Sequence, residues 1–152
     1  MMNFSLLEYV DLRKILPLIK KEFPYTQMTF LKLRKRFANK QKFLFLRVSQ
    51  KNELAGFAEV EFIDHMVARI NGIAVLQRFR KKGFAKCLLE NMLLLLSQMG
   101  CIKIILLVKE NNTNAKSLYK KFGFKMYDYD KIKKVESLSL NIHPESQYSF
   151  AA

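Results

Sequence analysis

A cluster of basic residues stands directly before a long apolar stretch in QRFRKKGFAKCLLENMLLLL, which covers residues 77–96. Five cations surround one glycine, Gly83, in this segment. The apolar part, LLENMLLLL, is shorter than the ~20 residues that a membrane span needs, so it predicts a helix packed inside a folded domain and no membrane partner. A helix that begins beside a glycine and several cations offers backbone N–H groups and its positive dipole end to an anion. The segment therefore predicts either a phosphate-sized anion site or a solvated basic surface.

The hydrophobic pattern of the whole chain predicts an α/β fold, with one mixed sheet and helices on both faces. Strands are expected at 3–8, 42–49, 54–63, 67–75, 102–108, 124–129 and 135–142. Helices are expected at 12–22, capped by Asp11, at 26–38, opened by Thr26, at 84–99 and at 112–121. The continuous apolar run at 102–108 is typical of a strand buried on both faces.

No linker rich in Pro, Gly or Ser interrupts the chain. We therefore expect one domain over residues 1–142 and a frayed tail over residues 143–152. The first residues lack a signal-peptide pattern, and Cys87 and Cys101 have neither metal-ligand nor CxxC spacing. The sequence thus predicts a cytoplasmic protein with free thiols and no metal site.

The net charge is +14, and the first fifty residues hold eleven basic and three acidic side chains. Such an excess favours acidic partners, RNA included. The alternative is a solvated, lysine-rich surface, because Lys outnumbers Arg 20 to 7 and phosphate-binding surfaces use Arg more. Nucleic acid is a possible partner that this composition does not favour.

Gly72 interrupts an otherwise regular strand just before Ile73, Ala74 and Val75. Glycine inside a strand commonly marks a bulge or a close approach of another backbone. A bulge would splay this strand from a parallel neighbour and leave N–H and C=O groups to bind an amide-bearing ligand. A ligand with amides along its arm and pyrophosphate at one end is coenzyme A.

Two blocks of the sequence resemble the GNAT superfamily of acetyl-CoA-dependent N-acetyltransferases. RKKGFA at 80–85 is similar to the R/Q-x-x-G-x-G/A pyrophosphate loop of that family. The segment from Val108 to Phe124 is similar to its V-x-x-x-N-x-x-A-x-x-L-Y…G-F pattern. The blocks have the family's order and separation, and the resemblance covers essentially the whole chain. It implies the GNAT fold, with a central, mostly antiparallel sheet splayed between two parallel strands.

The resemblance also implies an acyltransferase that moves an acetyl group from acetyl-CoA to a primary amine by direct attack. The main chain of the fourth strand should hold the pantetheine arm, and Asn112 should bond near the thioester. Tyr119 should face the sulfur as general acid, although plain packing of its ring is the alternative. The cofactor-binding residues implied in this way are Ile73, Ala74, Val75, Arg80, Lys81, Lys82, Gly83, Phe84, Ala85, Lys86 and Asn112.

The general base departs from the family pattern. Many protein-acetylating relatives carry Glu or His immediately before the valine of the fifth strand, where this chain has Leu107. A second base position of relatives matches Arg69, which cannot accept a proton. The remaining candidates, each of which could instead be a solvated strand-edge or turn residue, are Glu59, Glu61, Asp64 and His65.

The segment EFPYTQMTF at 22–30 is similar to the loop between the first two helices of N-terminal amine acetyltransferases, including the ribosomal-protein alanine type. This resemblance implies that Phe23 and Tyr25 form one wall of a peptide groove, and Tyr127 and Tyr129 could form the other. The favoured acceptor is a protein N-terminal amine. The alternatives are a small-molecule amine, a lysine side chain, or a non-catalytic acetyl-CoA-binding module with an acidic or RNA partner.

Overall fold

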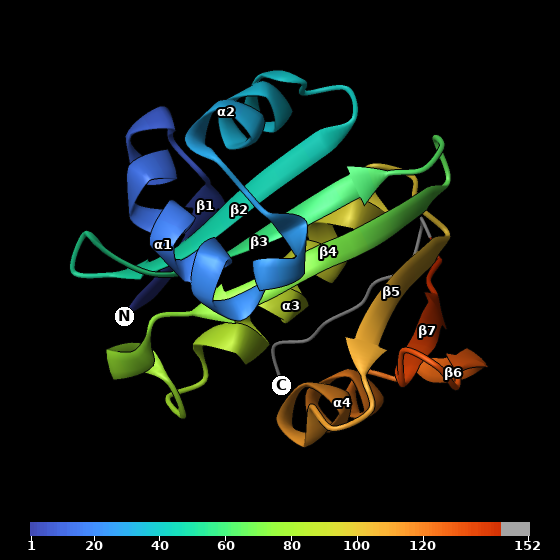
Figure 1. The fold of residues 1–152 in the computed structure, drawn as a ribbon. Coiled ribbons are helices and arrows are strands. Elements are labelled where there is room, and N and C mark those ends of the chain that lie inside the picture. Colours follow the sequence, from blue (N-terminus) through green and yellow to red (C-terminus); the bar gives the residue numbers. More distant parts are fainter. Residues whose placement is uncertain (144–152) are drawn as a thin grey trace.

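The computed structural model describes residues 1–143, in which seven strands form one sheet and four α-helices cover its faces (Figure 1). The strand order in the sheet is β1-β2-β3-β4-β5-β7-β6, which confirms the predicted α/β fold. Along the chain the elements are β1 (Met2–Leu6), α1 (Leu12–Glu22), α2 (Phe30–Ala38), β2 (Phe43–Gln50), β3 (Glu53–Phe62), β4 (Val67–Val75), α3 (Phe84–Gln98), β5 (Lys103–Lys109), α4 (Thr113–Lys121), β6 (Lys125–Asp130) and β7 (Val135–Asn141).

The sheet is antiparallel except where β4 and β5 run side by side. These two strands pair only from Val67 to Ile70 on β4 and from Lys103 to Leu106 on β5. Beyond this segment they diverge, as the green β4 and the orange β5 show in Figure 1. The splayed sheet expected from the sequence is therefore confirmed.

Two apolar cores lie on opposite faces of the sheet. α1 and α2 pack on one face, and α3 and α4 contribute to the core of the other. The leucines of the apolar stretch, among them Leu88, Leu89, Leu93 and Leu96, are buried in this second core. Within residues 1–143, no helix is both long and apolar enough to cross a membrane.

The segment between α1 and α2 differs from the prediction. Thr26 does not open α2, because it lies in a 3-10 turn, Pro24–Thr26, where its hydroxyl donates to the Phe23 carbonyl at 2.7 Å. Thr29 caps α2 instead, since its Oγ1 accepts the Lys32 N–H at 3.2 Å. Phe23, directly before the turn, lies against Gly72 of β4.

Asp11 stands at the start of α1, as predicted, but its side chain does not cap that helix. The carboxylate accepts the backbone N–H of Glu8 at 2.8 Å and pairs with Arg47 Nη1 at 3.0 Å. Asp11 is buried and Arg47 is mostly covered, so Asp11 joins α1 to β2 rather than satisfying the helix terminus.

The prediction that the strand at 102–108 is buried on both faces is wrong. β5 alternates between buried residues such as Ile104 and Leu106 and more accessible ones such as Ile105 and Leu107, the last of which is 62% exposed. The buried set belongs to the core under α3, whereas the core under α1 and α2 contains no β5 residue. The uncovered face of β5 borders the candidate site.

The predicted tail, residues 143–152, lies outside the described residues except for His143. The carbonyl of His143 accepts a hydrogen bond from Ser97 Oγ at 2.9 Å. This contact ties the chain just after β7 to the end of α3.

Candidate active site

A β-bulge opens the edge of β4 next to Gly72. The register pairs Gly72 with Glu59 and Ile70 with Val60, so Asn71 is the extra residue of the bulge. The sequence placed this irregularity at Gly72, one residue away. The bulge begins where the pairing of β4 with β5 ends.

The main chain after the bulge presents polar groups on the side where β4 and β5 diverge. Leu76 N–H donates to the Ala55 carbonyl at 2.8 Å, which fixes one bonded pair of the β3–β4 ladder. Because main-chain groups alternate along an antiparallel ladder, those of Val75 and Ile73 point away from β3. The Val75 carbonyl accepts Arg80 Nε at 3.0 Å. This edge can pair with an extended, amide-bearing ligand.

The basic loop ends at a left-handed glycine that begins α3. Gly83 has φ +89°, and Lys81, two residues earlier, has φ +61°. The first N–H groups of a helix have no partner within the helix, so α3 directs donors and its positive dipole end toward the loop. Phe84 and Ala85 follow Gly83. The Phe84 ring is buried against Phe79, with a centroid distance of 5.3 Å. The aromatic contact anchors the loop to the core.

The cations of the loop are not equivalent. Arg80 donates to Glu22, the last residue of α1, as well as to Val75, and Lys86 lies 3.8 Å from Glu90. Among residues 1–143, Lys81 and Lys82 make no ion pair. These two lysines are the cations that an anion could engage without displacing a carboxylate.

A pocket of about 280 Å³ opens beside the bulge on the face covered by α1 and α2. It brings together four of the predicted catalytic and substrate-binding residues, Phe23, Tyr25, Glu59 and Glu61. Arg69 and Leu107, which replace the base positions of relatives, line the same pocket. The pocket also contains Arg36 and Asn71, which the sequence did not identify.

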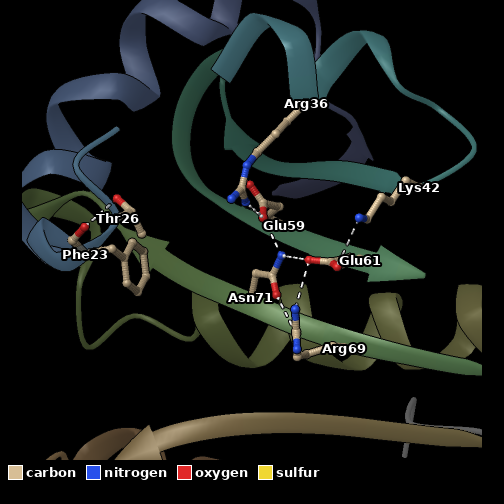
Figure 2. Close-up of polar contacts among 8 residues, drawn as sticks. All are labelled: Phe23, Thr26, Arg36, Lys42, Glu59, Glu61, Arg69 and Asn71. Atoms are coloured by element: carbon tan, nitrogen blue, oxygen red, sulfur yellow. Dashed lines mark hydrogen bonds and ion pairs between the residues drawn. The ribbon is translucent and has the colours of Figure 1, made fainter. Parts of the chain in front are cut away.

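The acidic residues of the pocket belong to one polar network, which Figure 2 shows between α2, β3 and β4. Glu59 Oε2 accepts Arg36 Nη1 at 2.8 Å and Asn71 Nδ2 at 2.6 Å. Glu61 Oε1 accepts Asn71 Nδ2 at 3.0 Å and Arg69 Nη2 at 3.1 Å. Residues 59 and 61 share one face because alternate residues of a strand point the same way.

The pKa values of the two carboxyl groups are shifted in opposite directions. Burial raises the pKa of Glu59, and the hydrogen bonds from Asn71 and Arg36 offset this only in part. Burial also acts to raise the pKa of Glu61, but hydrogen bonds from Asn71 and Arg69 and the charges of Arg69 and Lys42 bring it below the ordinary value. Glu59 is 6% exposed. Of the two, Glu59 is the carboxylate that holds a proton more readily.

Two residues of the second sequence block lie outside the pocket lining. Tyr119, on α4, is buried in the core under α3, with its ring 5.5 Å from that of Phe124. Burial raises the pKa of Tyr119 to about 12. Asn112 precedes α4, where its Oδ1 accepts the N–H of Ala115 at 3.3 Å. Both roles assigned to these residues toward acetyl-CoA stay predictions.

The structure does not place Tyr127 or Tyr129 in the pocket lining. Both residues lie on β6, which β7 separates from β5. Tyr129 donates its hydroxyl proton to Glu110 Oε2 at 3.1 Å, and Tyr127 lies 5.7 Å from Lys103 Nζ. The pocket wall observed here consists of Phe23 and Tyr25 alone among the four predicted aromatic residues.

Residues 10–124 match the model of the Acetyltransferase (GNAT) family. The ribosomal protein bS18-alanine N-acetyltransferase of Haemophilus influenzae is 32% identical over 91 residues, which are 60% of this chain and 61% of that protein. The chain thus matches about three fifths of the length of this relative.

Two solved structures share the fold. The ribosomal-protein-S18-alanine N-acetyltransferase of Escherichia coli superposes with a TM-score of 0.79 at 21% identity, over 99% of each chain. The PaiA N-acetyltransferase of Thermoplasma acidophilum, in complex with coenzyme A, superposes with a TM-score of 0.81 at 20% identity, over 93% of this chain and 99% of the other.

Proposed function

The chain belongs to the acetyltransferase (GNAT) family, and from this membership we propose that it acetylates the N-terminal amine of a protein or peptide. As a GNAT acetyltransferase, it is an acyltransferase that uses acetyl-CoA as the acetyl donor. The observation that carries the proposal is a buried carboxylate, Glu59, in a pocket whose wall includes Phe23 and Tyr25.

The proposed cosubstrate site combines the open edge of β4 with the start of α3. The main chain of Ile73 and Val75 would bind the pantetheine amides, because its polar groups point to the side where β5 has moved away. The N-terminus of α3, together with Lys81 and Lys82, would bind the pyrophosphate. Gly83 fits this role, since a side chain at its left-handed φ would be strained beside the ligand.

We assign the general base to Glu59 in preference to Glu61. A base is most effective when its pKa lies near the working pH, and burial moves the pKa of Glu59 upward in that direction. The pKa of Glu61 is held low by Asn71, Arg69 and Lys42, which makes it a weaker base. In this arrangement the base stands on β3, whereas Leu107 and Arg69 hold the corresponding positions of relatives on β5 and β4.

Tyr119 is proposed to donate a hydrogen bond to the leaving sulfur. With a pKa of about 12, its phenol stays protonated at physiological pH. Complete transfer of the proton to a thiolate with a pKa near ~8.5 would be uphill by roughly 5 kcal/mol. A hydrogen bond that strengthens as charge develops on the sulfur avoids that cost. The thiolate then leaves and takes its proton from water.

The acceptor class follows from the chemistry of amines. A protein α-amino group has a pKa of roughly 7.7–8.0, so about a tenth is neutral near pH 7, whereas a lysine side chain near 10.4 offers less than about a thousandth. This difference amounts to roughly 3 kcal/mol in favour of the N-terminal amine. The chain shares sequence and fold with bS18-alanine N-acetyltransferases, which supports the same acceptor class.

The proposal can be tested with two peptides of the same sequence, each with an internal lysine. One peptide has a free N-terminus and the other a blocked one. We expect acetylation of the free α-amine and almost none of the blocked peptide, measured by CoA release and by mass spectrometry of the modified position. Equal rates for both peptides would contradict the N-terminal assignment. Glu59→Gln should lower kcat about 100-fold or more, and Glu61→Gln serves as the matched control with a smaller effect.

A further inference from the structure

Asn71 uses its whole amide inside the polar network of the pocket. Its Nδ2 donates to Glu59 Oε2 at 2.6 Å and to Glu61 Oε1 at 3.0 Å, and its Oδ1 accepts Arg69 Nε at 3.0 Å (Figure 2). An amide has two N–H donors and one carbonyl acceptor. Only this orientation directs both donors to carboxylates and the oxygen to a guanidinium, so the surrounding charges fix the amide.

The bulge gives Asn71 its reach to both carboxylates. Glu61 lies opposite Arg69 and Glu59 lies opposite Gly72, and Asn71 is the additional β4 residue between these two pairs. A bulge leaves its extra residue unpaired and re-aims the side chain. In a regular ladder, position 71 would face a single residue of β3.

The two oxygens of Glu59 are therefore different. Oε2 receives both Arg36 and Asn71, whereas Oε1 makes no hydrogen bond with any residue among 1–143. Among residues 1–143, the one fully enclosed polar side-chain atom without a partner is Arg47 Nε, so Oε1 is not fully enclosed. It is accessible from the pocket and is the oxygen left to accept a proton.

The charged and titratable groups around Glu59 come from three elements and two adjacent segments. Asn71 holds no charge, so it can bridge the two carboxylates without adding an ion pair. The groups that face Glu59 or its partner Glu61 are Tyr25 in the turn before α2, Arg36 on α2, Lys42 before β2, Glu61 on β3 and Arg69 on β4.

We propose that Asn71 is a positioning residue for acetyl transfer, which binds Glu59 through Oε2 so that Oε1 takes the proton of the attacking amine. The inference rests on the proposed role of Glu59. The amine nitrogen forms a bond to the acetyl carbon, and the carbon–sulfur bond breaks with its electron pair on sulfur. The N–H bond breaks as Oε1, directly or through one water, gains the proton. Glu59 then releases this proton to solvent.

The test is a carboxyl ¹³C NMR titration of the full chain labelled at Glu, with Glu59→Gln and Glu61→Gln identifying the two signals. In Asn71→Leu, which keeps the volume and removes the donors, the Glu59 signal should titrate about one to two pH units higher, the range expected for losing a hydrogen bond to a charge. The kcat for a free-N-terminus peptide should fall about 10-fold or more, with little change in the KM for acetyl-CoA.

Arg69→Met is the matched control, because it removes a charge from the same network without removing a contact to Glu59. In that variant the larger upward shift should belong to Glu61. Should Asn71→Leu fold poorly, Asn71→Ser provides a smaller polar replacement, for which the Glu59 titration should again move upward.

Two outcomes separate this inference from the proposed function. Loss of turnover in Glu59→Gln together with an unchanged Glu59 titration in Asn71→Leu would overturn the role of Asn71 alone. Full turnover in Glu59→Gln would overturn the assignment of the base and, with it, the inference built on that base.

Discussion

The ring of Phe23 lies directly over Gly72, so that a Cβ at position 72 would stand 2.8 Å from Phe23 Cζ. Phe23 follows the last residue of α1, and Gly72 follows the bulge of β4. The two positions are 49 residues apart in the sequence. Their contact holds the turn Pro24–Thr26 against β4, the strand that carries Asn71. The glycine is required here for the space it leaves rather than for an unusual backbone angle.

Gly72→Ala should therefore displace the Phe23 ring and with it the turn Pro24–Thr26. We expect a loss of about 1–3 kcal/mol in the free energy of unfolding, as for other overpacked sites, and a larger rise in the KM for the peptide than for acetyl-CoA. Urea unfolding and steady-state kinetics measure the two effects. Phe23→Leu shortens the side chain, so the double variant should lose less than the sum of the single variants. Strict additivity would contradict the contact as the cause.

Most of the fold could be predicted because strong local patterns and global packing agree. The strand at 67–75 has the predicted limits, and the helix after the basic loop ends within one residue of its predicted end. The errors arise where a neighbour decides the outcome. The apolar run of β5 does not reveal that α1 and α2 stop short of it, which leaves Leu107 exposed.

The site could be predicted only in part for the same reason. Glu59 and Glu61 are candidates in the sequence because they lie on the predicted third strand, and Leu107 and Arg69 occupy the base positions of relatives. Arg36 carries no local signal, since its part in the site depends on how α2 crosses β3. Asn71 had a weak signal, an Asn before a Gly inside a strand, where both residue types are disfavoured. Its two carboxylate partners appear only once the register is known.

Gly83→Val should weaken acetyl-CoA binding about 10-fold or more, because a β-branched residue is strained at φ +89° and would obstruct approach to the start of α3. Isothermal titration calorimetry gives the Kd. The matched control is Gly100→Val, which places the same residue at φ +95° just beyond the other end of α3, where no atom of residues 1–143 apart from those of its chain neighbours comes within 4 Å of an added Cβ. Equal losses of affinity in both variants would show that backbone strain, and not the anion site, is responsible.

Lys81→Ala and Lys82→Ala should each weaken acetyl-CoA binding more than Lys86→Ala does. Lys86 has Glu90 nearby, whereas the other two lysines have no carboxylate partner among residues 1–143 and can engage an anion directly. We expect losses of a few-fold per lysine that shrink as salt concentration rises, since exposed charges are screened. Competition with inorganic pyrophosphate would check the assignment. A dominant effect of Lys86→Ala would place the anion one turn further along α3.

Tyr119→Phe should lower kcat about 10- to 100-fold with little change in the KM for acetyl-CoA, because the hydroxyl acts as charge develops on sulfur. The substitution removes one oxygen that has no hydrogen-bond partner within residues 1–143, so stability should be unchanged or slightly increased. Thermal unfolding tests this part. Tyr127→Phe, on β6, is the control with unaltered turnover. Undiminished turnover in Tyr119→Phe would leave Tyr119 as a packing residue.

Glu59 should make the fold less stable as the pH rises, which is the reverse of the usual effect of a carboxyl group. Its pKa in the folded chain is raised above the ordinary 4.5, mainly by burial, so the native state binds more protons than the unfolded state between these two values. The free energy of unfolding is therefore highest while Glu59 is protonated, and it falls as the pH rises through the folded pKa of Glu59. Glu59→Gln removes this titration. Its free energy of unfolding, measured by urea titration relative to the original chain, should increase as the pH rises from the ordinary pKa of 4.5 to the raised pKa of the folded chain.

Glu61→Gln should show the opposite slope. The pKa of Glu61 is lowered in the folded chain, so this group adds stability above its ordinary value of 4.5 and loses it as the pH falls. Relative to the original chain, Glu61→Gln should become less stable as the pH rises through this lower window. Opposite slopes from two glutamates on one strand would show that Glu59 destabilises the fold when charged, whereas charged Glu61 stabilises it.

Glu59→Gln should then be the more stable and the less active of the two variants, as expected if burial of this carboxylate serves proton transfer at a cost in stability. Parallel slopes would contradict the difference in proton affinity on which the choice of Glu59 depends.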